Sequence, residues 1–291
     1  MVGLEWLEVS VSCSRELEEA VCAALYEAGA DGVAVYTHEG TEVRGYFGSE
    51  KDLSRLRRAI ENLPVFFPFS RRPYLRVKTL DEADWANAWK EYYDVTHIGE
   101  RTVVVPSWRS YQRKPGEIVI LLDPGMAFGT GTHPTTIMVI EELERRVRRG
   151  MRVLDIGTGS GILAAAAAVT GAEVVAIDKD EVAVRVAREN MKKNEVDNRV
   201  ELYHGTLETY LARHAPLPFD LVLANITANV IASLFEPVCR CLGPNGLFIT
   251  SGIIASRVPV VMEAARESGF QTVFQREMSD WMLLAFSRRG G

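Results

Sequence analysis

Residues 153–178 read VLDIGTGSGILAAAAAVTGAEVVAID, and this stretch decides the fold. It begins with a short apolar run that ends in Asp155, continues through three glycines spaced two apart, and then becomes rich in alanine. A second apolar run, 174–177, ends in Asp178. The pattern predicts a strand, a glycine turn, a helix and a second strand. This is the opening unit of a doubly wound α/β sheet.

The spacing of the glycines distinguishes between two kinds of nucleotide cofactor. A dinucleotide fingerprint G-x-G-x-x-G that starts at Gly157 needs glycine at position 162, where Ile162 stands. The sequence has D-x-G-x-G-x-G from Asp155 to Gly161, which resembles the first motif of the Rossmann-like S-adenosylmethionine-dependent methyltransferases. Asp178 lies where a carboxylate can accept hydrogen bonds from a ribose diol. We therefore expect S-adenosylmethionine as the cofactor, with a dinucleotide as the alternative.

Length, composition and charge narrow the class of protein. A chain of 291 residues suggests two domains, and 47% hydrophobic with 25% charged residues is an ordinary globular composition. We find no apolar run long enough to span a membrane, and the N-terminal residues lack the regions of a signal peptide. A net charge of −6 argues against a general polyanion binder. We expect a cytoplasmic protein.

The four cysteines give no sign of a metal site. They are Cys13, Cys22, Cys239 and Cys241. The pair Cys239-x-Cys241 has no second ligand pair that could complete a zinc site. We interpret all four as reduced thiols and predict no bound metal.

Residues 1–79 predict a small α+β domain. We expect strands over 6–11, 33–36, 43–47 and 74–78, a helix from Ser14 to Gly29, and a second helix that Ser49 caps. The order β-α-β-β-α-β matches a ferredoxin-like split unit. The domain has no catalytic motif, so its fold alone assigns it no role. We interpret it as a substrate-recognition domain. A stability or dimerisation module is the alternative.

Residues 80–99 are expected to connect this domain to the rest of the chain. Within them, Trp85, Trp89 and Tyr92 recur at the spacing of one helical face. We predict a short connecting helix whose aromatic side chains pack against a domain. Residues 100–291 then form the Rossmann-like domain.

Residues 122–136, LDPGMAFGTGTHPTT, form a second informative stretch. Its glycines, threonines and prolines are incompatible with a regular element. Pro134 suits the first position of a helix, with His133 or Thr132 before it and an end near Arg149. A glycine-hinged loop ahead of a helix is typical of a lid over a cofactor. An ordinary structured loop is the alternative.

Beyond Asp178 the βα pattern continues. The apolar run from Phe219 ends in Asn225, which places this side chain at the carboxyl edge of the sheet, where ligands bind in open α/β folds. Its amide and backbone carbonyls can each accept a hydrogen bond from an amine. Alternatively, Asn225 only caps a helix that begins at Ala228. Two further strands, over 271–276 and 281–286, are expected to close a sheet of about seven strands.

Together these stretches resemble the PrmA family, the methyltransferases of protein eleven of the large ribosomal subunit. The resemblance is carried by residues 122–136, VLDIGTGSGILA at 153–164, LANI at 223–226 with SGII at 251–254, and the connector at 84–108. It covers nearly the whole chain. It implies a Rossmann-like α/β methyltransferase sheet with a smaller ferredoxin-like N-terminal domain. Met126 and Thr227 are mild departures that leave the assignment unchanged.

The resemblance also implies roles for individual residues. The residues implied to bind the cofactor are Thr132, Thr136, Asp155, Gly157, Gly159, Gly161, Asp178 and Asn225. The glycines would contact its methionine portion, Asp178 the ribose, and Thr136 with Asn225 would complete the site. The candidate catalytic residues are Asn225, Phe128 and His133. Phe128, Thr132 and His133 would border the methyl-transfer channel, and His133 is a possible base that otherwise caps its helix or lines the lid.

The predicted function is therefore S-adenosylmethionine-dependent methylation of protein amines. The resemblance implies lysine ε-amines and the N-terminal α-amine of ribosomal protein eleven as acceptors. We expect a monomer that binds neither a membrane nor, stably, a nucleic acid. The alternatives are a methyltransferase for a nucleic acid or a small-molecule amine, and a non-catalytic cofactor-binding ribosome-assembly factor. The prolines and aromatic residue that often grip a base after this strand are absent from Asn225-Ile226-Thr227-Ala228.

Overall fold

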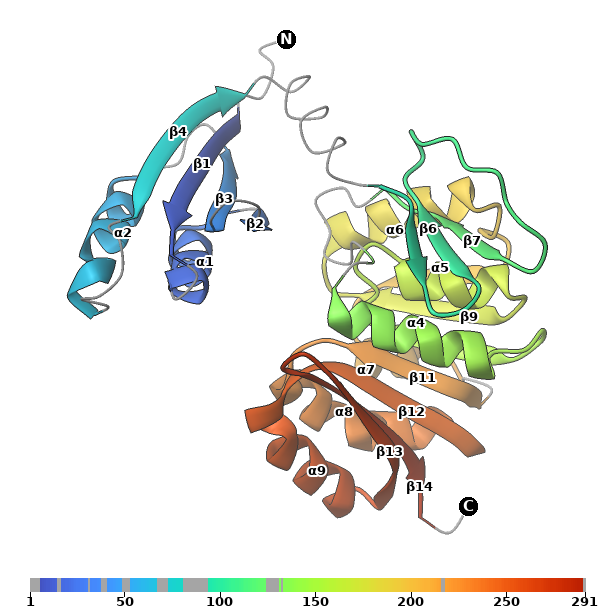
Figure 1. The fold of residues 1–291 in the computed structure, drawn as a ribbon. Coiled ribbons are helices and arrows are strands. Elements are labelled where there is room, and N and C mark those ends of the chain that lie inside the picture. The colour runs from blue at the N-terminus through green and yellow to red at the C-terminus, as the bar shows by residue number, and fades with distance from the viewer. Residues whose placement is uncertain are drawn as a thin grey trace. The chain divides into compact units, whose positions relative to one another are not determined.

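The chain forms two compact units, Met1–Tyr93 and Asp94–Gly291, in a computed structural model (Figure 1). The structure describes residues 6–14, 17–30, 32–37, 41–48, 53–66, 73–80, 94–123, 131, 133–215 and 218–289. Each unit is described by itself. Among these residues, no helix has the length and apolar character needed to cross a bilayer.

The N-terminal unit is a four-stranded antiparallel sheet with two helices. Its elements are β1 (Trp6–Cys13), α1 (Glu18–Glu27), β2 (Gly32–Thr37), β3 (Thr41–Gly48), α2 (Ser54–Phe66) and β4 (Tyr74–Leu80). The strand order is β2-β3-β1-β4. Alternate residues of β1, such as Val9 and Val11, are buried against α1 and α2, where Leu25 and Ile60 are fully enclosed. The predicted ferredoxin-like fold is confirmed.

One detail of the predicted first helix is wrong. Ser14 was expected to cap it, but α1 begins at Glu18, and the buried Ser14 Oγ has no hydrogen-bond partner among the described residues. The backbone instead turns through a bond from Leu17 N to Ser14 O at 2.9 Å. The expected cap of the second helix, Ser49, lies outside the described residues. The connecting helix is predicted within residues 80–99, and residues 81–93 of this range also lie outside the described residues.

The second unit is built on a seven-stranded sheet in the order β10-β9-β8-β11-β12-β14-β13. The strands are β8 (Arg152–Ile156), β9 (Glu173–Asp178), β10 (Val200–His204), β11 (Phe219–Asn225), β12 (Leu242–Ile254), β13 (Phe270–Met278) and β14 (Trp281–Arg288). Neighbours from β10 to β12 run parallel, and β14 is antiparallel to both β12 and β13. The strand order reverses between β8 and β11, which makes their carboxyl ends the expected ligand site.

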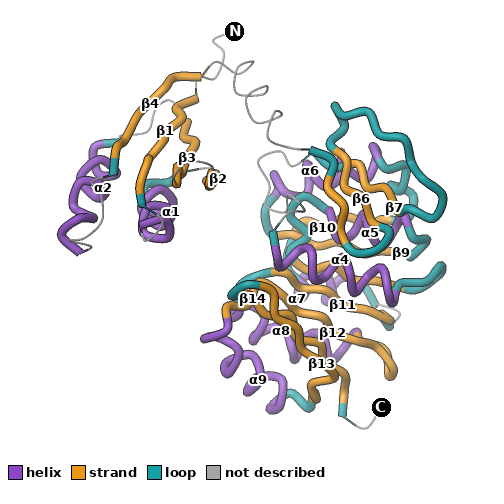
Figure 2. Tube along the Cα trace, in the orientation of Figure 1, coloured by secondary structure: helices purple, strands orange, loops and turns teal. Residues whose placement is uncertain are grey.

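Helices cover both faces of this sheet (Figure 2). They are α4 (Pro134–Arg146), α5 (Ile162–Val169), α6 (Glu181–Lys193), α7 (Leu207–Arg213), α8 (Ala228–Cys241) and α9 (Val258–Glu267). Residues of α4, α5 and α6 share one buried cluster with the sheet, and residues of α7, α8 and α9 share the other. This arrangement is a Rossmann-like α/β fold, so the predicted fold class is confirmed.

The end of one predicted helix is shifted. The helix expected from Pro134 to about Arg149 ends at Arg146. Between β12 and β13, a 3-10 turn, η3 (Ala255–Arg257), leads directly into α9.

A small sheet precedes the large one in sequence. It consists of β5 (Thr96–Ile98), β6 (Thr102–Val105) and β7 (Ile118–Leu121), with β6 and β7 parallel. Its buried side chains, such as Val104 and Ile120, pack into the same cluster as α4 and α5. The domain boundaries that we expect at residues 79 and 99 stay predictions.

Candidate cofactor and amine site

The glycine turn, residues 157–161, joins the carboxyl end of β8 to the start of α5. Gly157 has φ +74°, and a Cβ there would lie 2.5 Å from Cγ2 of Ile226. Gly161 is the N-cap of α5 with φ +82°, and its Cβ would lie 2.8 Å from Cε of Met191. Both positions therefore need glycine for the backbone conformation and for space. The turn presents main chain where a side chain cannot fit.

Asp178 lies beside this turn and contacts it directly. One carboxylate oxygen, Oδ2, accepts from Gly159 N at 2.9 Å, and Oδ1 accepts from Asp180 N at 3.0 Å. Thr158 N donates to Ile177 O at 3.0 Å, which folds the turn onto the end of β9. The structure thus brings together the glycines and the acid that the sequence predicted as one site. Each carboxylate oxygen retains a lone pair for a further donor, such as a ribose hydroxyl.

Asp155 lies under the turn and is fully buried. Its Oδ2 accepts from the hydroxyl of Thr158 at 2.6 Å. Burial, together with the nearby negative charge of Asp178, raises the pKa of Asp155 to about 7, although the bond from Thr158 opposes this. The site therefore contains a carboxyl group that changes charge near neutral pH.

Asn225 is the last residue of β11, and β11 is the strand next to β8. Its Nδ2 donates to Oγ1 of the fully buried Thr136 at 3.3 Å. Its Oδ1 is buried and has no hydrogen-bond partner within the part of the chain that the structure describes. The interpretation of Asn225 as a helix cap is wrong, because the N-cap of α8 is Thr227. The site therefore holds an oriented amide with an unused acceptor.

His133 is the N-cap of α4, followed by Pro134 at the first helical position as predicted. Its Nδ1 accepts from Thr135 N and lies 2.8 Å from Oγ1 of the same threonine. Its ring packs edge-on against Trp281, with 5.0 Å between the ring centroids. Burial lowers the pKa of His133 below its ordinary value, so the imidazole is neutral at neutral pH. The capping alternative for this residue is confirmed.

Two side chains that the sequence analysis did not single out support this arrangement. Ser251, the first residue of the SGII motif, donates from Oγ to Thr135 O at 3.2 Å and thereby ties α4 to β12. Asn190, on α6, donates to Ser160 O in the glycine turn at 2.8 Å. A polar residue on the apolar face of a predicted helix was the available signal for Asn190.

Three of the residues named for the loop, Met126, Phe128 and Thr132, lie outside the described residues. Their predicted roles stay predictions. The loop's last part is described from His133 onwards, together with Gly131, which is buried.

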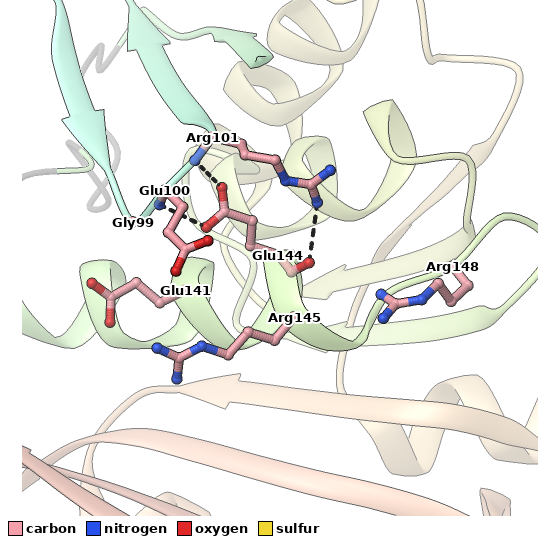
Figure 3. A pocket seen from close by; sticks show the side chains of 7 residues that line it. All are labelled: Gly99, Glu100, Arg101, Glu141, Glu144, Arg145 and Arg148. Carbon is pink, nitrogen blue, oxygen red and sulfur yellow. Dashed lines mark hydrogen bonds between the residues drawn. The ribbon is translucent and has the colours of Figure 1, made fainter. Parts of the chain in front are cut away.

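A cavity of about 460 Å³ in the second unit contains none of the predicted site residues. It is lined by Gly99, Glu100, Arg101, Glu141, Glu144, Arg145 and Arg148 (Figure 3). Glu144 fills part of it by accepting from the backbone amides of Glu100 and Arg101. Its wall contains both glutamate and arginine side chains, so it has charges of both signs. We therefore assign this cavity no part in the cofactor site.

Comparison with known proteins identifies close relatives of the whole chain. The family model for ribosomal protein L11 methyltransferase (PrmA) matches residues 5–289. The chain is 37% identical to the ribosomal protein L11 methyltransferase of Alkaliphilus oremlandii, covering 99% of this chain and 100% of that protein. It is 39% identical to that of Chloroflexus aurantiacus, covering 99% of each.

One solved structure is similar to this chain in both fold and sequence. The ribosomal protein L11 methylase of Lactobacillus delbrueckii subsp. bulgaricus has a TM-score of 0.62 and 35% sequence identity to this chain. The match covers 67% of this chain and 99% of that one.

Proposed function

Because the chain belongs to the ribosomal protein L11 methyltransferase (PrmA) family, we propose that it methylates amino groups of ribosomal protein L11. The enzyme class follows from the family: the protein is an S-adenosylmethionine-dependent methyltransferase, as the glycine motif predicted. The acceptors in this proposal are lysine ε-amines and the N-terminal α-amine. One observation carries it furthest, namely the buried Oδ1 of Asn225, which has no partner among the described residues and lies where the strand order reverses.

The residues around the glycine turn fit the cofactor. Gly157 and Gly159 have positive φ and are only partly buried, so a ligand can reach their main chain, and Asp178 retains acceptor capacity for a ribose diol. When bound, S-adenosylmethionine supplies a methyl group on a sulfonium, which is already a good leaving group. In this proposal the chain holds it through these residues and through Thr136 and Asn225.

The task left to the protein is to position a neutral amine. Alignment of reacting groups supplies about 7–11 kcal/mol in favourable cases. Asn225 Oδ1 can accept a hydrogen bond from the amine and direct its lone pair away from the amide. A buried acceptor without a partner costs about 1–3 kcal/mol, so an amine donor that reaches Oδ1 removes this penalty.

The amine must also lose a proton before it attacks. A lysine amine in water has a pKa of about 10.4 and is mostly protonated at neutral pH. A low-dielectric pocket near a positive charge lowers that pKa. We assign the proton to water, because Nδ1 of His133 is engaged with Thr135 as the cap of α4. His133 remains the alternative base, and Phe128 with Thr132 remain proposed borders of the transfer channel.

The N-terminal unit is proposed to dock the substrate protein. It contains a complete core of its own, with side chains such as Val9, Leu25 and Phe47 fully enclosed. We also propose that the protein is a cytoplasmic monomer and that it does not bind nucleic acid stably. The net charge of −6 supports the last point.

A transfer assay with labelled S-adenosylmethionine tests the proposal. The acceptors are free ribosomal protein L11, an unrelated lysine-rich protein and bulk RNA, followed by mass spectrometry of the products. We expect label on L11 alone, in mass steps of one methyl group on amines. Label on RNA, or no label on any acceptor while the cofactor binds, contradicts the proposed substrate.

A further inference from the structure

Asn190 is a buried polar side chain on an otherwise apolar helix face. It is 1% exposed, and its neighbours on the buried face of α6 are Ala183, Val184, Ala187 and Met191. A side-chain amide in such a place needs partners for both its donors and its acceptor. Those partners show what this asparagine does.

The Asn190 amide bonds two segments that are distant in sequence. Nδ2 donates to Ser160 O at 2.8 Å and to Asp123 O at 3.3 Å. Oδ1 accepts from Asp123 N at 3.2 Å. The Asn190 side chain thus joins the glycine turn to Asp123, which lies two residues beyond the end of β7. Both the donor and the acceptor of the amide take part.

The contact with the turn lies at a sensitive place. Ser160 is fully buried. In sequence it stands between Gly159, whose N–H donates to Asp178, and Gly161, the N-cap of α5. A Cβ at Gly161 would lie 3.0 Å from Cβ of Ala187, so the turn rests directly on α6. Helix α6 therefore both supports the turn, through Ala187, and binds the Ser160 carbonyl, through Asn190.

We propose that Asn190 is a positioning residue for the cofactor. By donating to the Ser160 carbonyl, it holds residues 157–161 in the shape that binds S-adenosylmethionine, and it ties that shape to Asp123, two residues beyond the end of β7. It acts through the turn and does not itself contact the reacting atoms. The inference rests on the proposed function, in which this turn holds the cofactor.

Asn194, one turn further along α6, provides a matched control. Its Oδ1 accepts from Leu121 N at 2.8 Å, and its Nδ2 donates to Leu121 O at 2.6 Å. It therefore tethers β7 with the same chemistry as Asn190. Within the described residues it makes no hydrogen bond to the glycine turn. A purely structural role for both asparagines predicts similar effects of the two substitutions.

The experiment compares Asn190→Ala, Asn190→Asp and Asn194→Ala in the full chain. Calorimetry gives the Kd of S-adenosylhomocysteine, amide hydrogen exchange reports on residues 157–161 without ligand, and melting gives Tm. Asn190→Asp conserves volume but places a carboxylate oxygen against the Ser160 carbonyl, so it keeps the test valid if the alanine variant folds poorly. We expect both Asn190 variants to raise Kd about tenfold and to exchange faster in the turn. Asn194→Ala should lower Tm but leave Kd within about twofold.

Two results overturn the inference: an unchanged Kd in both Asn190 variants, or an equal rise in Kd for Asn194→Ala. Failure of the cofactor assignment on which the inference rests looks different, because the unsubstituted chain would then bind no S-adenosylhomocysteine, whereas failure of L11 as the substrate leaves that binding intact. In that case the exchange rates in the ligand-free turn still decide whether Asn190 holds its shape. Unchanged rates there refute the tether itself.

Discussion

The Asn225 amide donates from Nδ2 to the hydroxyl oxygen of Thr136 at 3.3 Å, across 89 residues of sequence. The bond joins the carboxyl end of β11 to the first turn of α4. The bond occupies Nδ2 and leaves Oδ1 as an acceptor with no partner among the described residues. The helix that supplies Thr136 is itself fixed, because Ser251 bonds the Thr135 carbonyl. The orientation of the proposed amine-binding group is thus decided by two neighbouring elements.

Replacement of Thr136 by valine tests this orientation. Valine matches the shape of threonine but leaves Asn225 Nδ2 without its partner, at a cost of about 1–3 kcal/mol. We expect kcat to fall about tenfold, because the amide can rotate and its carbonyl is no longer held. Thr136→Ser should restore most of the rate. If Thr136 instead acts mainly on the cofactor, the KM for S-adenosylmethionine will rise while kcat is kept.

Replacement of Asn225 by alanine tests the amine site itself. The substitution removes the acceptor proposed to position the amine, and a loss of alignment costs about a hundredfold in rate. We expect the free energy of unfolding to change by less than about 1 kcal/mol, because the deletion also removes a buried unpartnered oxygen. Steady-state kinetics and urea unfolding of the same preparation measure both quantities. Near-normal turnover contradicts the role of Asn225.

Replacement of Gly157 by alanine tests the glycine turn, with Gly150→Ala as its control. Both glycines have positive φ, +74° and +85°, so each substitution costs about 1–2 kcal/mol for the backbone. Only at Gly157 does the new methyl group meet a neighbour, Ile226, and this adds about 1–3 kcal/mol. Urea unfolding should therefore separate the two variants, and only Gly157→Ala should lose cofactor affinity. Equal unfolding curves contradict the close approach to Ile226.

The buried carboxyl of Asp155 predicts a pH-dependent stability. Its folded pKa of about 7 lies above the ordinary value of 3.8, so between these values the folded state holds a proton that the unfolded state has released. Stability should therefore fall as pH rises through this window, by up to about 4 kcal/mol from this group. Asp155→Asn removes the titration and should flatten the curve between pH 4 and pH 7. Denaturant unfolding across this range measures it, and parallel curves for the two proteins refute the assignment.

The strand, glycine turn, helix and strand of residues 153–178 follow their predicted pattern closely. These elements depend on neighbours in sequence: positive φ selects glycine at positions such as Gly161, and apolar runs of strand length select β8 and β9. The same local rules placed Pro134 at the start of α4 and Asn225 at the end of β11.

The buried face of α6 shows where local pattern was insufficient. The sequence offers apolar residues on more than one side of this helix, and Val182 and Val186 are only partly buried. The fully buried side is the neighbouring one, which contains Ala183, Ala187 and Asn190. Packing against the glycine turn selected it, because the turn needs small side chains beneath Gly161 and a donor for Ser160.

The sequence by itself determined the order of the elements, the fold class and the family, because these follow from periodicity, turn chemistry and motif spacing. The tertiary structure alone decided which polar groups meet. The bonds of Asn225 with Thr136 and of Asn190 with Ser160 join residues 89 and 30 positions apart. Hydrogen bonds require distances near 3 Å, which only the reversal of strand order between β8 and β11 and the packing of α4 and α6 on the sheet provide.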